Sequence, residues 1–236
     1  MKDNYILTAE SVTAGHPDKL CDTIADNVLD ACLKEDSSAR VACEVLATAG
    51  KILVAGELRT TASPDVEAIV RQTVRNAGYD CNYNVEVRLH TQSPDIAGAV
   101  DGETLGAGDQ GIMYGYACWE TVELLPAPVV LANRITSLLT TCREEKLISG
   151  IGPDGKAQVS VQYAFGVPER VDTIVISCQH DADKDPDELR EELRRLVIAR
   201  ACHDVRVDEQ TKILINPSGR FVCGGLDADT GLTGRK

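Results

Sequence analysis

A chain of 236 residues is long enough for one or two domains, and folding buries roughly 70% of the surface that such an unfolded chain exposes. Its net charge of −13 argues against a general binder of nucleic acid or of anionic membranes, because either partner requires a basic surface. The same charge still permits a polyphosphate ligand, since a few lysines or a bridging Mg²⁺ reverse the sign locally.

The nine cysteines are an odd number and form no C-x-x-C motif. Most follow apolar or small residues, as Cys43 and Cys223 do, which favours buried free thiols in a reducing compartment over a zinc site or a disulfide framework. The N-terminal residues have no apolar signal-peptide core, and the sequence has no run of 18 apolar residues. We therefore expect a cytoplasmic protein without a membrane span.

The first half of the chain predicts two helices and three strands. Pro17 and Asp18 are typical of a helix start, and Gly78 is typical of a residue that ends a helix. Apolar residues recur at helical spacing after Pro17, whereas the segments that follow have the composition and turns of strands. The predicted order is a helix over 17–34, strands over 40–47 and 51–58, a helix from 64 that ends at Gly78, and a strand over 84–90.

The same order returns in the second half of the chain. The predicted elements are a helix over 128–143, strands over 157–165 and 173–180, a helix over 186–202 whose start has the capping-box spacing of Asp185 and Glu188, and a strand over 212–215. This repetition predicts an α+β fold of two duplicated units, each with a helical layer on a mixed sheet. Residues 93–127 connect the units and are rich in glycine, so they form either a loop or a site.

Within that connection, residues 106–111 read G-A-G-D-Q-G and satisfy the G-x-G-x-x-G pattern of dinucleotide-binding proteins. A polar segment precedes them instead of an apolar strand, so the pattern does not favour a Rossmann fold. A glycine loop that lets the backbone approach a ligand and an ordinary turn both remain open interpretations.

Two short segments carry groups that suit a phosphate. His16, Asp18 and Lys19 lie at a predicted helix start, where free N–H groups favour an anion; there Asp18 can hold Mg²⁺ while His16 donates to a phosphate oxygen. Near the other end of the sequence, Arg235 and Lys236 follow glycines and can bind phosphate as well. The respective alternatives are a capped helix with exposed charges and a disordered basic tail.

Several carboxylates interrupt apolar segments. Glu44 and Glu57 lie within predicted strands, and a carboxylate on a half-buried sheet needs a cation or several donors, unless it faces solvent on an edge strand. Residues 154–156 are explained by a turn before the strand over 157–165. Residues 227–231 begin like a calcium loop, but their glycine comes one position early, which rejects an EF-hand.

Several short motifs are distributed over essentially the whole chain, and their order and spacing are informative together. They are Glu10-Ser11-Val12, 15–19 (GHPDK), 40–44 (RVACE), 92–96 (QSPDI), 106–111, 126–128 (PAP), 219–222 (GRFV) and 231–236 (GLTGRK). Together they resemble the methionine adenosyltransferase (S-adenosylmethionine synthetase) family, and their combination is far more specific than any one of them.

The resemblance implies an enzyme in which the sulfur of methionine attacks C5′ of ATP and expels triphosphate, which is then hydrolysed to phosphate and diphosphate. A thioether needs no general base, so the protein has to position the reactants and stabilise charge. The implied ligands of ATP are His16, Asp109, Asp154, Lys156, Phe221, Asp229, Arg235 and Lys236; those of methionine are Glu57, Gln92 and Asp229. The resemblance further implies Asp18 as a ligand of Mg²⁺, Glu44 as a ligand of K⁺, and His16, Lys156, Arg235 and Lys236 as catalytic residues.

The implied fold has three similar α+β domains about a pseudo-threefold axis, in dimers or tetramers with shared active sites. We expect an N-terminal domain over 1–98, a central domain over 99–224 and the start of a third over 225–236. The rest would come from the same polypeptide or from a second chain, and the 236 residues alone are expected to be inactive or weakly active. Residues 226–228 and Ala157 depart from the family pattern without removing a ligand.

Two rival hypotheses follow from the same residues. One is a non-catalytic nucleotide-binding or regulatory subunit of a full-length methionine adenosyltransferase. The other is a nicotinamide-dependent dehydrogenase built on residues 106–111, which would bind NAD and show no dependence on K⁺.

Overall fold

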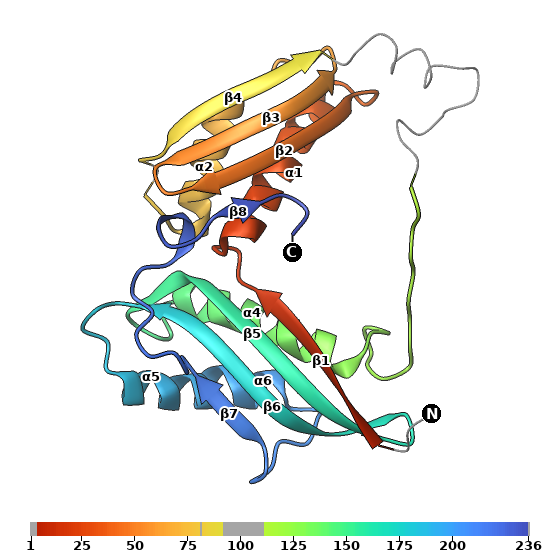
Figure 1. Ribbon diagram of the computed structural model, residues 1–236, viewed down its shortest axis with the longest axis vertical. Helices are drawn as coiled ribbons and strands as arrows, with labels where there is room; N and C mark the ends of the chain where they lie inside the picture. Colours follow the sequence, from red (N-terminus) through yellow and green to blue (C-terminus); the bar gives the residue numbers. More distant parts are fainter. Residues whose placement is uncertain (1–3, 81, 92–110, 236) are drawn as a thin grey trace.

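The computed structural model describes residues 4–80, 82–91 and 111–235, which form two α+β units placed end to end (Figure 1). The first unit comprises α1 (Pro17–Glu35), β2 (Arg40–Thr48), β3 (Lys51–Arg59), α2 (Val66–Ala77) and β4 (Asn84–Thr91). The second comprises α4 (Ala127–Glu144), β5 (Ile151–Ala164), β6 (Val167–His180), α5 (Pro186–Leu193), η1 (Arg194–Ile198), α6 (Ala199–Ala201) and β7 (Lys212–Ile215). The duplicated helix–strand–strand–helix–strand order and the α+β class are confirmed.

Each sheet also contains a strand from outside its own unit. The strand orders are β4-β3-β2-β8 and β1-β5-β6-β7. β1 (Asn4–Val12) precedes the first unit but pairs antiparallel with β5, and β8 (Gly231–Leu232) follows the second unit but pairs antiparallel with β2. In both sheets an antiparallel hairpin is followed by a parallel strand, so the two mixed sheets have the same topology.

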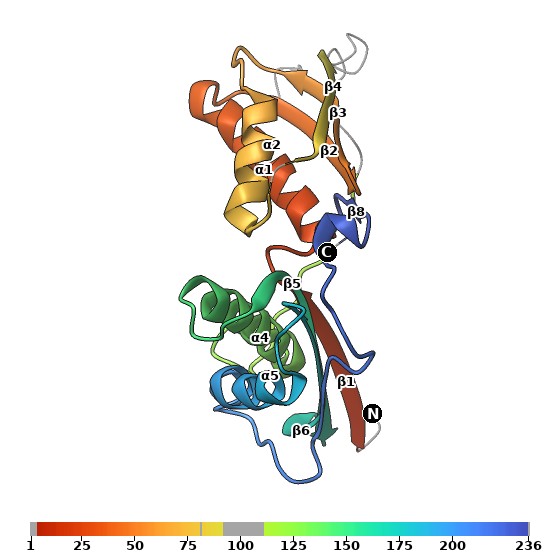
Figure 2. The same cartoon turned by 90° about the vertical axis from the view of Figure 1, so that its left-hand side faces the viewer.

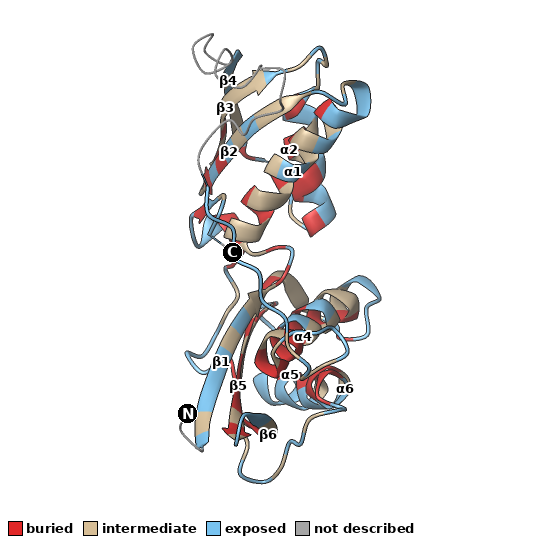
Figure 3. Ribbon diagram, turned by 90° about the vertical axis from the view of Figure 1, so that its right-hand side faces the viewer, coloured by how far each residue is buried: buried red, intermediate tan, exposed pale blue. Residues whose placement is uncertain are grey.

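Helices cover one face of each sheet (Figure 2), and many of the helix and strand residues are coloured as buried in Figure 3. Ile24 of α1 and Val54 of β3 belong to the first core, and Leu131 of α4 and Ile176 of β6 belong to the second. Leu226, in the short helix η2 (Gly225–Asp227), packs into the first core and is 1% exposed. The C-terminal segment is therefore anchored in the unit that lies farther from it in sequence.

The helix ends follow local chemistry. α2 begins at Val66 rather than at 64, because the Asp65 carboxylate caps it by accepting from the Ala68 N–H at 3.0 Å. Gly78 ends α2 as predicted, with a φ of 102° that suits glycine. Asp185 caps α5 and accepts from the Glu188 N–H at 2.8 Å.

Two predicted boundaries are wrong. β5 begins at Ile151 rather than at 157, because β6 pairs with it from Ile151, which lies opposite His180; the interpretation of residues 154–156 as a turn is therefore incorrect. The helix expected over 186–202 is α-helical only to Leu193 and continues through the π-helical turn η1 into the short α6.

The cysteines of the described residues are free thiols of differing exposure. Cys21, Cys32, Cys142, Cys178 and Cys202 are buried, as expected, whereas Cys223 is exposed. Burial raises the pKa of the Cys178 thiol to about 12, which makes it unreactive at neutral pH. Separately, none of the helices in the described ranges is long and apolar enough to cross a membrane.

Candidate functional site

Most of the predicted ligand residues lie where the chain passes between the two units (Figure 1). At this junction the turn 13–16 links β1 to α1, and the segment 221–235 returns from the second unit to β8. Thr13 Oγ1 donates to the Pro153 carbonyl at 2.7 Å. A Cβ on Gly15 would lie 2.4 Å from that same oxygen, so only glycine permits this approach. The turn is thereby held against the start of β5.

His16 and Asp18 form the start of α1. His16 is the N-cap, and its Nδ1 accepts from the Asp18 N–H at 3.2 Å. A neutral ring that accepts at Nδ1 carries its proton at Nε2, which is the donor that a phosphate oxygen requires. Asp18 Oδ1 accepts from the Leu232 N–H at 3.0 Å. His16 therefore caps the helix through Nδ1, as one of the two interpretations expected. Asp18 instead contacts the C-terminal strip, residues 231–234.

The strip 231–234 is fixed in place by the first unit. A Cβ on Gly231 would lie 2.3 Å from the Pro17 carbonyl oxygen, and the Gly234 N–H donates to Asp22 Oδ1 at 2.9 Å. The Thr233 N–H donates to the Val45 carbonyl at 3.0 Å, and its hydroxyl donates to the Glu44 carboxylate. The disordered-tail interpretation is therefore wrong for these residues, and Arg235, which is exposed, follows directly.

Asp154 is the most buried carboxylate of the junction, with 7% of its surface exposed. Its Oδ2 accepts from the Gly225 N–H at 2.8 Å. Burial raises the pKa of Asp154 and the charge of Asp229 adds to this, whereas the Gly225 N–H and the nearby His16 oppose it. The structure therefore brings His16, Asp154 and Asp229 within electrostatic reach of one another.

Lys156 lies on the face of β5 that the helices leave uncovered. Its Nζ lies 2.8 Å from Glu10 Oε2 on β1, and each side chain is about 40% exposed. The pairing of Glu10 with Lys156 was missed in the sequence, because β1 itself was not predicted.

Glu44 and Glu57 lie on the uncovered face of the first sheet, on its two central strands. Glu44 is exposed, and Glu57 lies opposite His90 of β4, whose Nε2 is 3.3 Å from its carboxylate. The sheet is half-buried, as expected, whereas the alternative of an edge strand is wrong because β2 and β3 are central strands.

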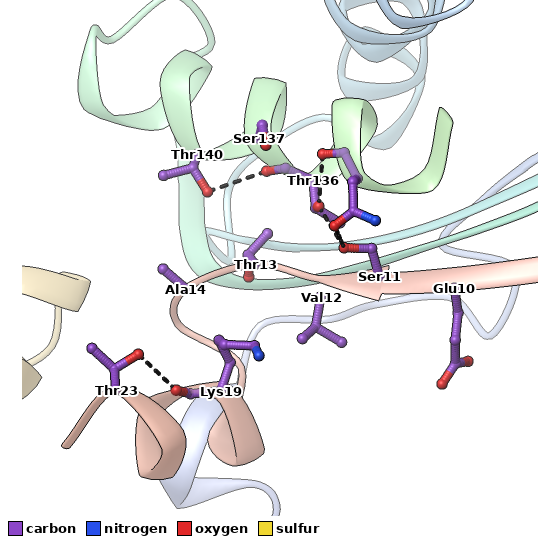
Figure 4. Close-up of a pocket in the computed structure, with 11 residues that line it drawn as sticks. Glu10, Ser11, Val12, Thr13, Ala14, Lys19, Thr23, Thr136, Ser137 and Thr140 are labelled. Carbon is purple, nitrogen blue, oxygen red and sulfur yellow. Dashed lines mark hydrogen bonds between the residues drawn. The ribbon is translucent and has the colours of Figure 1, made fainter. Parts of the chain in front are cut away.

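A cavity of ≈590 Å³ lies beside the junction, between β1, α1 and α4 (Figure 4). Hydroxyl side chains dominate its wall, where Ser11 and Thr136 share a hydrogen bond of 2.9 Å. Glu10, Thr13 and Lys19 belong to its wall, so the cavity adjoins the site described above.

Three predicted ligand residues, Gln92, Asp109 and Lys236, lie outside the described residues, as do positions 106–110 of the glycine motif. Within the described ranges, no group of three or more His, Cys, Asp or Glu side chains is arranged to hold a metal ion.

Comparison with known proteins decides the family. A family model for the S-adenosylmethionine synthetase N-terminal domain matches residues 4–103, and one for the central domain matches residues 104–221. The S-adenosylmethionine synthase of Finegoldia magna is 46% identical over 99% of this chain and 64% of its own length. That of Desulfosudis oleivorans is 47% identical over the whole chain and 64% of its own length. The chain belongs to the S-adenosylmethionine synthetase family.

The resemblance drawn from the motifs is thus confirmed, and the chain spans 64% of the length of these synthases. Three residues that the motifs did not indicate hold the backbone of the synthetase junction. The Tyr79 hydroxyl donates to the Gly15 carbonyl at 2.7 Å, and Gln179 and His180 bond to residues 154, 221 and 222. Their partners are backbone atoms, which leave no residue pattern in a sequence.

Proposed function

We propose that the chain provides the N-terminal and central parts of an enzyme that makes S-adenosylmethionine from ATP and methionine. The observation that carries the proposal is the junction itself, where His16, Asp18, Asp154 and the strip before Arg235 meet at a helix N-terminus. Such a terminus favours phosphate groups, and the buried end of the site near Asp154 suits an uncharged nucleoside.

The first step of the reaction requires no general base, because a thioether sulfur attacks without losing a proton. The methionine sulfur forms a bond to C5′ of ATP while the C5′–O5′ bond breaks, and water then cleaves the released triphosphate into phosphate and diphosphate. His16 Nε2–H donates to the oxygen that gains charge, and Lys156 and Arg235 neutralise the leaving chain. Asp154 and Phe221 would hold the adenosine, Glu57 the methionine, and Asp229 would lie between them.

Asp18 and Glu44 fit the two expected cations, Mg²⁺ and K⁺, if oxygen atoms of substrate or water complete the coordination of each ion. Mg²⁺ usually takes one or two carboxylates and completes its shell with phosphate oxygens and water, which matches Asp18 at the start of α1. When bound, it would neutralise charge on the triphosphate. Glu44 offers an exposed carboxylate to K⁺ on the open sheet face.

Completion of the site is part of the proposal. The three remaining ligands would be Gln92, Asp109 and Lys236, and the part of the relatives beyond the match would supply a third unit, in cis or from a second chain. We propose the domain limits 1–98, 99–224 and 225–236, a homo-oligomer with shared sites on the open sheet faces, and a cytoplasmic location.

The test uses a completed enzyme, made by fusing the chain to the C-terminal third of the Finegoldia magna synthase. With ATP, methionine, Mg²⁺ and K⁺, it should form S-adenosylmethionine detectable by mass spectrometry, whereas the unfused chain should form little or none. Binding of ATP without any product would favour the non-catalytic subunit. Tight binding of NAD without dependence on K⁺ would favour the dehydrogenase.

A further inference from the structure

The end of β6 faces the segment 216–222, which continues beyond the last residue of β7. The backbone pairing of β6 with β7 ends at Ile176 and Ile215, and side-chain hydrogen bonds join the two segments beyond this point. Asn216 Oδ1 accepts from the Cys178 N–H at 2.8 Å, and its Nδ2 donates to the Cys178 carbonyl at 3.0 Å. The His180 N–H donates to the Phe221 carbonyl at 2.9 Å, and the Phe221 N–H donates to His180 Nε2 at 3.2 Å. The segment that carries Phe221 is thus fixed to β6 on both sides of Gln179.

Gln179 itself connects two parts of the site. Its Oε1 accepts from the Asp154 N–H at 3.1 Å, and its Nε2 donates to the Val222 carbonyl at 3.1 Å. Asp154 lies on β5, and Val222 follows Phe221 directly. One amide group therefore sets the separation between the backbone at Asp154 and the backbone next to Phe221.

Two glycines leave room for this amide. A Cβ on Gly152 would lie 2.5 Å from Gln179 Cδ, and a Cβ on Gly224 would lie 2.7 Å from the same atom. Contacts this short do not occur between real side chains, so both positions exclude any larger residue while Gln179 stays in place. Gly224 also precedes Gly225, whose N–H donates to the Asp154 carboxylate. The amide, the glycines and Asp154 form one packed arrangement.

We propose that Gln179 is a positioning residue for the nucleoside part of ATP, which it serves by holding Asp154 and the Phe221 segment at a fixed spacing. The inference rests on the proposed function, because Asp154 and Phe221 are its expected adenosine contacts. The amide of Gln179 bonds to backbone atoms at Asp154 and Val222, so it acts on the shape of the space between Asp154 and Phe221 that would receive the nucleoside, here called the nucleoside slot. A slot that is already formed before ATP arrives avoids the cost of ordering the loop on binding.

The test replaces Gln179 by Met in the completed enzyme, which retains the length of the side chain and removes both hydrogen bonds. The KM for ATP should rise about tenfold, as expected for loss of two ordinary hydrogen bonds, while the KM for methionine stays within about twofold. Gln162→Met is the matched control, since Gln162 lies on β5 of the same sheet and its amide donates to the exposed Glu169 carboxylate at 3.3 Å. It should leave both constants unchanged.

A second variant addresses the same amide from the other side. The three atoms nearest to the Cβ position of Gly152 all belong to Gln179, at 2.5–2.7 Å, so Gly152→Ala strains the contact with Gln179 first and should raise the KM for ATP in the same selective way. If both folded variants keep the KM for ATP, or raise both KM values equally, Gln179 has a merely structural role and the inference is wrong.

A failure of the proposed function can be distinguished from a failure of the inference about Gln179. In that case the unsubstituted enzyme forms no S-adenosylmethionine, and calorimetric titration with adenylyl imidodiphosphate still tests Gln179. A dissociation constant that rises about tenfold in Gln179→Met supports the inference, and an unchanged constant contradicts it.

Discussion

The Gly225 N–H donates to the Asp154 carboxylate at 2.8 Å, across 71 positions of sequence. This bond joins the C-terminal segment to β5 at the point where Leu226 enters the core of the first unit. Because the carboxylate is buried, its protonation is linked to the stability of the junction.

The first prediction concerns this linkage. Burial raises the pKa of Asp154 in the folded chain above its ordinary value of 3.8. Between these two pKa values the folded state holds a proton that the unfolded state has lost. The contribution to stability is therefore present below that ordinary value and is lost as pH rises through the folded pKa. Asp154→Asn retains an acceptor for Gly225 and removes the titration. Urea unfolding between pH 3 and pH 7 should show the wild type losing stability relative to Asp154→Asn as pH rises, and parallel curves would contradict the account.

The second prediction concerns the close approach of Gly231 to α1. Gly231→Ala places a methyl group where the Pro17 carbonyl lies and should destabilise the chain by about 1–3 kcal/mol, the usual cost of overpacking. Gly234→Ala is the control, because no atom lies within 4 Å of its Cβ position and only its φ of +75° adds strain. Chemical denaturation should show the larger loss for Gly231→Ala. The reverse order would mean that the strip does not pack as described.

The third prediction separates two roles of Asp18. Asp18→Asn keeps an oxygen that accepts from the Leu232 N–H but removes the negative charge. Its stability should stay within about 2 kcal/mol of the wild type, since a half-buried charge at a helix start contributes no more than that. In the completed enzyme, however, it should need far more Mg²⁺ for half-maximal rate. An unchanged Mg²⁺ requirement would remove Asp18 from the metal site.

The fourth prediction concerns the pair of Lys156 and Glu10. Both side chains are about 40% exposed, so breaking the pair should cost less than about 1 kcal/mol of stability. Lys156→Met should nevertheless lower kcat of the completed enzyme strongly, because it removes a cation from the leaving triphosphate. Glu10→Gln, which breaks the same pair and keeps the lysine, should retain most of the activity. Equal losses in both variants would indicate that the pair acts only in folding.

The units were predictable because their helices and hairpins are local: apolar spacing, proline starts and Gly78 mark them in the sequence. β1 and β8 were not, because their partners lie far away, as in the pairing of Asn4 with Ala164 and of Ala47 with Gly231. That gap hid the contact of Glu10 with Lys156, whereas residues 154–156 were placed in a turn because their pairing with β6 is also distant in sequence. The motifs located His16, Asp18 and Asp154, whereas the roles of Tyr79 and Gln179 depend on backbone atoms that only the fold brings near.

The most direct measurement of the central claim is the product balance of the completed enzyme in a single turnover. Rapid quenching followed by mass spectrometry and ion chromatography should find S-adenosylmethionine, phosphate and diphosphate in equal amounts, with Lys156→Met reducing all three together. Hydrolysis of ATP to phosphate without S-adenosylmethionine, or no turnover at all by an enzyme that binds ATP, would contradict the claim.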